Sequence, residues 1–385
     1  MMERILLCKP RMSGREIDYI KDALAEDWAV PLGPDVTAFE KELGEYLGTD
    51  HVVALNAGTS AIHLALLALG VGQGDEVIAQ SMTFAASVNP IRYVGATPVL
   101  IDSEPRTWNM NPELLEEVIL DRERVTGQRP KAILPVALYG MPYEIGRIME
   151  VAGRYGIPVV EDAAEGLGSE FEGRKLGTFG QYGALSFNGN KIITTSGGGA
   201  LICPDAEAAA RVKFLATQAR EPFPYYQHEV IGYNYRLSNI SACIGRAQLE
   251  VLPEYLAHHR MVQDLYQELL KDVAGVEVHG NPDSRFDSNF WLCTILLGNA
   301  DCGTLNDGAP DSEVEALRRR LDEARIETRP LWKPMYDQPV YADAPAYRTG
   351  VSDLLFRRGL CLPAGPYVTP DNVRYIADII RSEIK

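Results

Sequence analysis

The sequence has no long uninterrupted apolar run. Nowhere in its 385 residues does an apolar stretch approach the roughly 20 residues that span a bilayer. Residues 1–20 also lack the apolar segment of a secretory signal. We therefore expect no membrane association and a cytoplasmic location.

Positive charge is scarce. Thirty-seven Lys and Arg residues face 53 Asp and Glu residues, for a net charge of -16. The long-range field of such a protein repels phosphate, which excludes general binding of nucleic acid or of an anionic membrane. An anionic ligand would therefore need a local positive site.

Cysteine is also sparse, with six residues scattered along the chain and no C-x-x-C pair. No histidine pair lies near them, so neither a zinc site nor a disulfide framework is indicated. We expect reduced, mostly buried thiols and no metal.

What the sequence does have is a regular alternation of short β-rich runs with helical stretches. Seven runs are typical of strands: residues 51–56, 75–80, 97–102, 131–136, 158–163, 183–187 and 199–204. This alternation predicts an α/β fold, a mostly parallel sheet covered by helices on both faces. The chain is long for a single core. We expect a large α/β domain with an N-terminal helical segment over residues 1–250, and a smaller α+β domain over residues 251–385.

Ligands of open parallel sheets bind beyond the carboxyl ends of the strands. After the first run, Gly58, Thr59 and Ser60 open a helix. A helix N-terminus can bind a phosphate through its free N–H groups. Alternatively, Thr59 or Ser60 simply caps the helix.

Two further strand ends carry unusual residues. Asp162 and Glu165 lie among alanines, so at least one carboxylate is expected to face a specific cation or donor. Phe84 lies at the start of a helix, where it either belongs to the core or stacks on a planar ligand.

The last of these ends holds Ser186, followed by Lys191 in a polar loop that contains glycine. Lys191 is either an ordinary solvated lysine or a covalent anchor. A catalytic lysine forms a Schiff base with an aldehyde, and pyridoxal phosphate (PLP) is the common protein-bound aldehyde. PLP needs a lysine, an aspartate for its pyridinium nitrogen, an aromatic on its ring and donors for its phosphate, and each has a candidate here. Lys191 would also move the substrate proton.

Six stretches together resemble a known family. They are NAGTSAIHLAL, TFAASVNPIRYVGATPVLID, VVEDAAEGLGS, GALSFNGNKIITTSGGGAL, GYNYRLSNISACIGRAQLE and ETRPLWKPMY. They are similar to the nucleotide-sugar aminotransferases of the DegT/DnrJ type, which have the fold of aspartate aminotransferase (PLP fold type I). The resemblance implies a mostly parallel seven-stranded sheet, PLP as cofactor and L-glutamate as amino donor.

The resemblance also implies roles for individual residues. Lys191 matches the Schiff-base lysine, Asp162 the pyridinium partner and Phe84 the ring-stacking aromatic. The remaining cofactor residues are the phosphate ligands Thr59 and Ser186 with Gly58 and Ser60 beside them, Glu165 near the pyridoxal O3′, and Asn234, which reaches the cofactor of a neighbouring subunit, with Arg236 next to it. A homodimer with shared sites follows.

The lysine loop and the stretch around residue 332 look most like the branch that aminates C4 of UDP-4-keto-6-deoxy sugars. Arg329 and Lys333 are candidates for the pyrophosphate of the nucleotide sugar, or else surface cations, and Trp332 lies between them. Tyr336 departs from the histidine common in that branch. The alternatives are a PLP-dependent sugar dehydratase, since members with His in place of Lys191 resemble dehydratases, another PLP enzyme of this fold, or a scaffold protein without cofactor.

Overall fold

The computed structural model describes residues 3–298 and 309–384. Its main sheet contains all seven predicted strands. In spatial order they are β1 (Val52–Leu55), β9 (Gly199–Ile202), β8 (Tyr182–Ser186), β5 (Val160–Asp162), β4 (Ala132–Leu134), β2 (Glu76–Gln80) and β3 (Thr97–Ile101). Isolated parallel bridges join β4 to β5. Only β9 runs antiparallel to its neighbours in this sheet, so the predicted α/β class with a mostly parallel sheet is confirmed.

Helices cover both faces of this sheet because successive strand residues point to opposite sides. In β1, Val52 and Ala54 pack into one apolar core, while Val53 and Leu55 pack into the other. The first core is closed mainly by α2 (Pro34–Leu47), α5 (Pro112–Thr126) and α6 (Ile145–Tyr155), and the second by α3 (Gly58–Ala68), α4 (Ala85–Tyr93) and α7 (Ala206–Ala216). The strand residues are therefore apolar at nearly every position, whichever face of the sheet they point to.

A second, antiparallel sheet lies towards the C-terminus. Its order is β10 (Val276–Val278), β12 (Cys293–Leu297), β15 (Gly359–Leu362) and β13 (Arg329–Pro330), and it packs with α10 (Ser312–Glu323) and α12 (Pro370–Glu383). A third small sheet joins β11 (Phe286–Asp287), β6 (Glu170–Phe171) and β7 (Arg174–Lys175). The remaining elements are α1 (Glu16–Ala25), α8 (Asn239–Glu250), α9 (Leu252–Leu270), α11 (Val351–Arg358), β14 (Ala346–Tyr347) and three 3₁₀ turns, η1 (Leu138–Gly140), η2 (Met335–Asp337) and η3 (Pro339–Tyr341).

Two features connect the halves of the chain across the predicted boundary at residue 250. Helix α9 contributes Leu252 to the core of the main sheet and Leu270 to the core of the second sheet. The chain from Met335 to Tyr347 then returns to the main sheet, where β14 pairs in parallel with β3 as an eighth, two-residue strand. The division into residues 1–250 and 251–385 stays a prediction.

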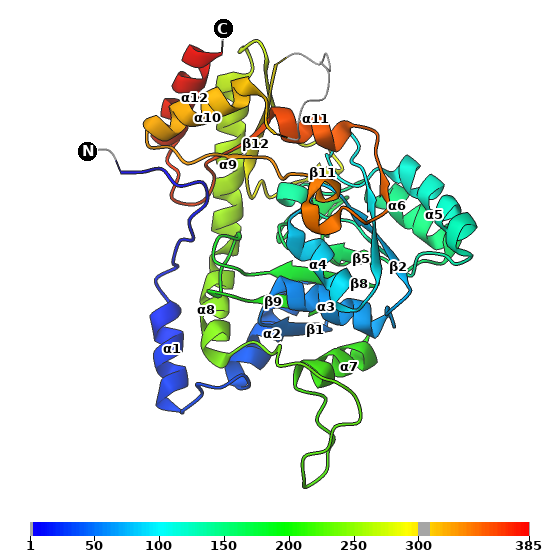
Figure 1. Ribbon diagram of the computed structural model, residues 1–385. Helices are drawn as coiled ribbons and strands as arrows, with labels where there is room; N and C mark the ends of the chain where they lie inside the picture. Colours follow the sequence, from blue (N-terminus) through cyan, green and yellow to red (C-terminus); the bar gives the residue numbers. More distant parts are fainter. Residues whose placement is uncertain (1–2, 299–308, 385) are drawn as a thin grey trace.

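One loop stands away from the body. Residues 220–232, which follow α7, extend from the molecule as a long green loop in Figure 1. In the described ranges, 3–298 and 309–384, no helix is long and apolar enough to cross a membrane.

The return of the chain to the main sheet is fixed by a buried carboxylate, Asp102, at the end of β3. It accepts hydrogen bonds of 2.6 to 2.9 Å from the backbone N–H groups of Ser103, Thr349, Gly350 and Ser352 and from the Thr349 hydroxyl. Burial by itself would raise the pKa of Asp102, but the hydrogen bonds, with Ser352 first, outweigh it and lower the pKa.

We expect Asp102→Asn to lower the free energy of unfolding by about 2–4 kcal/mol at pH 7. The NH₂ group of the new amide would face N–H donors that now bind a carboxylate oxygen. Because the pKa of Asp102 is lower in the folded than in the unfolded protein, its ionised form stabilises the fold at pH values above the unfolded-state pKa of about 4. This stabilisation is lost as the pH falls through the folded-state pKa. Urea unfolding should therefore show the two proteins converging at low pH. Asp22→Asn, at an exposed position, should cost less than about 0.5 kcal/mol.

Candidate active site

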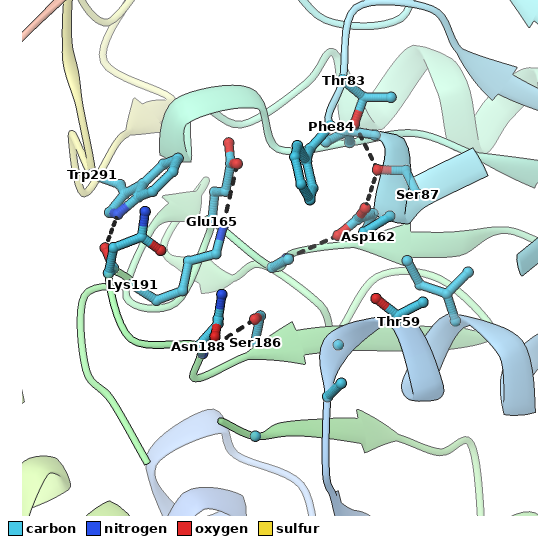
Figure 2. Close-up of a pocket in the computed structure, with 18 of the residues that line it drawn as sticks. Thr59, Thr83, Phe84, Ser87, Asp162, Glu165, Ser186, Asn188, Lys191 and Trp291 are labelled. Atoms are coloured by element: carbon cyan, nitrogen blue, oxygen red, sulfur yellow. Dashed lines mark hydrogen bonds and ion pairs between the residues drawn. The ribbon is translucent and has the colours of Figure 1, made fainter. Parts of the chain in front are cut away.

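A cavity of about 340 Å³ lies where β5 and β8 end and α3 begins (Figure 2). Eight of the predicted site residues line it: Gly58, Thr59, Phe84, Asp162, Glu165, Ser186, Lys191 and Trp332. All but Trp332 come from strand ends, helix starts or the loop after β8, which the topology of the main sheet brings to one edge, as expected for an open α/β sheet.

Lys191 points into this cavity from the loop after β8 (Figure 2). Its Nζ lies 3.3 Å from Glu165 Oε1 and 4.1 Å from the centre of the Trp291 ring. The Trp291 indole N–H donates to the carbonyl of Asn190 at 2.7 Å, which fixes the peptide just before the lysine. The Lys191 side chain is only 14% exposed, so it is not an ordinary solvated loop lysine.

Asp162, the last residue of β5, is buried on another side of the cavity. Its Oδ2 accepts from the Ser87 hydroxyl at 2.5 Å and its Oδ1 from the Ala164 N–H at 3.1 Å. Burial raises the pKa of this carboxyl, and the hydrogen bonds and the Lys191 charge oppose the rise. Asp162 thus presents a dehydrated carboxylate, which favours a cationic or proton-donating ligand atom.

Glu165 is the second buried carboxylate. It accepts from Lys191 and, at 2.7 Å, from the backbone N–H of Tyr139, whose φ of 54° is unusual for a residue with a side chain. Burial raises the pKa of Glu165, and the charge of Lys191 is the main influence that lowers it. Glu165 therefore holds the lysine amine in place.

The N-terminus of α3 forms the third side. Its first residue is Gly58 and its N-cap is Ala57, and no side chain caps it, so the capping role considered for Thr59 or Ser60 is wrong. The first N–H groups of the helix are left for a ligand. A Cβ at Gly58 would lie 3.0 Å from the Cβ of Ser186, which explains the glycine.

The Ser60 side chain differs from the other predicted cofactor residues of this helix start. Its hydroxyl donates to Asn56 Oδ1 at 2.7 Å, one turn back, and Ser60 does not line the cavity. Its neighbour Thr59 does line the cavity. A buried serine in the first turn of a helix often satisfies its hydroxyl locally.

Aromatic rings close the site. Phe84, just before α4, is 56% exposed, and its ring centre lies 5.4 Å from that of Trp332. Trp332 also stacks on Tyr139 and donates its backbone N–H to the Tyr139 hydroxyl at 2.8 Å. Phe84 therefore has an open face towards the cavity.

The structure does not place Arg329 and Lys333 in the cavity. The Arg329 side chain is 67% exposed and pairs with Glu327 at 3.0 Å. Lys333 follows Trp332 directly but is not among the residues that line the cavity. Trp332 is the only one of the three predicted substrate residues that lines the cavity.

Asn234 and Arg236 also lie outside the cavity of their own subunit. Asn234 is exposed, which is compatible with the predicted contact to a neighbouring subunit but does not test it. Arg236 is buried and bound to Glu40 and to the carbonyl of Ala54, so it supports the start of the sheet.

Several residues of the site were not predicted from the sequence. Thr83 and Ser87, four residues apart around the start of α4, could have been found from their spacing. Asn188 and Asn190 come just before Lys191 in the same loop and could have been found from the loop itself. Trp291 gives no local signal, because it lies 101 residues from Asn190 in the sequence.

Comparison with known proteins now decides the family. The pattern of the DegT/DnrJ/EryC1/StrS aminotransferase family matches residues 10–381. The chain belongs to this family. The resemblance seen in the sequence is thereby confirmed, and the protein is a PLP-dependent sugar aminotransferase.

Individual relatives agree with this assignment. EpsN of Bacillus subtilis (strain 168), which carries the provisional name of a pyridoxal phosphate-dependent aminotransferase, is 46% identical over 384 residues, 99% of this chain and 96% of that protein. The GDP-perosamine synthase of Caulobacter vibrioides is 37% identical over 372 residues, 97% and 96% of the two chains. A crystal structure of a DegT DnrJ EryC1 StrS aminotransferase from Brucella abortus superposes with a TM-score of 0.88 at 32% identity, covering 96% and 95%.

The cavity fits the cofactor of such an aminotransferase. It contains an amine, a dehydrated carboxylate on another side, an open aromatic ring and a cradle of neutral donors around Gly58. Among the residues that the structure describes, no group of three or more His, Cys, Asp or Glu could hold a metal ion. The donor set suits an organic cofactor that carries an aldehyde and a phosphate.

Borohydride reduction of the PLP-loaded protein should leave a pyridoxyl group on the peptide that contains Lys191, as detected by mass spectrometry. Lys191→Ala should carry no such group, because the variant lacks the amine. The peptide that contains Lys175 is a matched control and should carry no pyridoxyl group. Lys175 is also half-buried and paired with a carboxylate, that of Glu170. A pyridoxyl group on another lysine of the wild type would contradict the assignment.

Proposed function

We propose that this aminotransferase moves the amino group of L-glutamate to the C4 keto group of a nucleotide-linked 4-keto-6-deoxy sugar, with UDP as the first nucleotide to test. The observation that carries the proposal is the position of Lys191, whose buried amine faces a cavity bounded by Asp162 and by the free N-terminus of α3. The product would be an amino sugar for glycan synthesis.

In this proposal each side of the cavity holds one part of PLP. Lys191 binds the aldehyde carbon, Asp162 faces the pyridine nitrogen and Phe84 stacks on the ring. Thr59 and Ser186, with the N–H groups that begin at Gly58, bind the phosphate. When bound, PLP accepts the electrons that the Cα–H bond of the substrate leaves behind when the proton is removed.

The chain's own groups handle the proton. Once the amine of the donor has displaced Lys191 from the aldehyde carbon, the freed Nζ would take the proton from the donor Cα and pass it to that carbon. The sugar half of the exchange would run the same transfer in reverse. Glu165, at 3.3 Å, holds the amine within reach, and the Trp291 ring covers it. Exclusion of water by Trp291 and Trp332 strengthens these interactions.

Recognition of the sugar is supported by the branch resemblance and by Trp332 at the cavity. Tyr336, which departs from the histidine of that branch, is buried beneath the guanidinium of Arg348 and does not line the cavity. The difference therefore lies outside the described wall of the pocket. The name of the Caulobacter relative makes GDP the direct competitor of UDP.

A panel of 4-keto-6-deoxy sugars linked to UDP, GDP and TDP tests the substrate. With ¹⁵N-labelled L-glutamate, we expect label in the sugar and release of 2-oxoglutarate, fastest for a UDP-linked sugar. Mass spectrometry and NMR of the product identify the aminated carbon. Lys191→Ala should lower kcat by about a thousandfold or more, because the covalent step and the proton transfer both fail.

Other products would point to other enzymes. A sugar that loses oxygen without gaining nitrogen indicates the dehydratase alternative. If the GDP-linked sugar reacts fastest, the proposed reaction stands and the proposed nucleotide, UDP, is wrong. Wild-type protein that binds no PLP would contradict the whole proposal.

We also infer a homodimer with shared sites. The loop of residues 220–232 exposes a set of apolar side chains on a segment that leaves the body: Phe223, Tyr225, Tyr226, Val230 and Ile231. Exposed apolar surface of this kind supports a contact with a second copy. Asn234 follows this loop directly and is itself exposed.

Mixed dimers test this arrangement. Lys191→Ala and Asn234→Ala subunits should each give weak homodimers, whereas co-expression should recover about a quarter of wild-type activity, since half of the dimers are mixed and each restores one of two sites. Activity no higher than the sum of the separate variants would contradict shared sites. Lys175→Ala with Asn234→Ala controls for the effect of mixing.

A further inference from the structure

Two buried hydroxyl groups stand behind Asp162. The Ser87 hydroxyl lies 2.5 Å from Asp162 Oδ2, and the Thr83 hydroxyl lies 2.6 Å from that of Ser87. The three residues are 4% exposed or less, and Figure 2 shows them in line along one side of the cavity. Both hydroxyl residues also line the cavity.

The chemistry fixes the direction of this chain of hydrogen bonds. An ionised carboxylate only accepts, so the single proton of the Ser87 hydroxyl points at Asp162. Ser87 can then only accept from Thr83, which must be the donor of the second bond. Hydrogen bonds that point the same way polarise one another, so Thr83 strengthens the bond that Ser87 makes.

This chain acts on a carboxyl group that needs support. Burial raises the pKa of Asp162 and so favours its neutral form, and the Ser87 hydrogen bond is the first influence that opposes burial. The charged groups that face Asp162 are Lys191, which favours ionisation, and Glu165, whose own pKa the Asp162 charge raises. The two hydroxyls therefore stabilise the ionised form of Asp162, for which a second cation would otherwise be needed.

We propose that Ser87, supported by Thr83, is a positioning residue that keeps Asp162 ionised and directed at the ring nitrogen of PLP. This inference rests on the proposed placement of PLP in the cavity. An ionised Asp162 keeps the proton on the ring nitrogen, and a protonated ring is the form that accepts electrons from the substrate. No bond to carbon is made or broken by the hydroxyls.

A structural role for the same hydroxyls would have a different signature. If they served only to begin α4, their removal would lower stability and leave the ring nitrogen unchanged. The protonation of that nitrogen is visible in the ¹⁵N chemical shift of PLP labelled at the ring and bound to the protein. This readout does not depend on turnover.

The experiment compares Ser87→Ala, Ser87→Thr and Thr83→Val, each loaded with ring-labelled PLP. In wild type we expect the shift of a protonated ring nitrogen. Ser87→Ala should move it towards the unprotonated value and raise the Kd of PLP by roughly tenfold or more, as expected for a lost hydrogen bond to a charged group. Thr83→Val should move it less, and Ser87→Thr should restore the wild-type shift.

Ser81→Ala is the matched control. Ser81 is also fully buried and lies two residues before Thr83, but its hydroxyl contacts that of Ser352 and it does not line the cavity. We expect it to keep the wild-type shift. Movement of the shift in Ser81→Ala equal to that in Ser87→Ala would overturn the specific role of Ser87.

The outcomes separate this inference from the function on which it rests. If Ser87→Ala binds PLP with the wild-type shift, the positioning role is wrong and the aminotransferase proposal stands. If Ser87→Ala does not fold, the isosteric Thr83→Val decides, and an unchanged shift there overturns the role of the hydroxyl chain. If wild type binds no PLP, the proposed function itself fails.

Discussion

The burial of two carboxylates at the end of β5 is the constraint on which the site depends. Asp162 and Glu165 lie in one cavity of an acidic protein, and both would be neutralised by dehydration without partners. The two carboxylates are stabilised by different partners. Asp162 receives the Ser87 hydroxyl and a backbone N–H, whereas Glu165 receives the Lys191 amine and a second backbone N–H. The partners of these two residues define where a cofactor lies.

The main sheet makes this arrangement possible. The neighbouring parallel strands β5 and β8 end at one edge of the sheet, with Asp162 and Ser186 as their last residues, and α3 brings Gly58 against Ser186. The lysine loop follows β8 and folds back over the same edge. The second half of the chain then adds Trp291 and Trp332, which cover the cavity without supplying charge.

The sequence predicted much of this because local patterns carry it. Seven strands appeared as short apolar runs, and residues after four of these runs proved to line one cavity. Errors occurred where a side chain had two local options. The Ser60 hydroxyl donates to Asn56 and Ser60 does not line the cavity, and Arg329 pairs with Glu327 on the surface. Charge and residue type alone could not separate these options.

By itself, the sequence determined the α/β class and the family, and it singled out Lys191, Asp162 and Phe84 as candidates, since these follow from periodicity and from motifs within short segments. The tertiary structure alone decided that Trp291 contacts Lys191 and that Tyr139 binds Glu165. It also decided that Trp332 lies at the cavity, where its backbone N–H donates to the Tyr139 hydroxyl. These contacts join residues far apart in the chain, and their geometry depends on how the helices and the second sheet pack against the first.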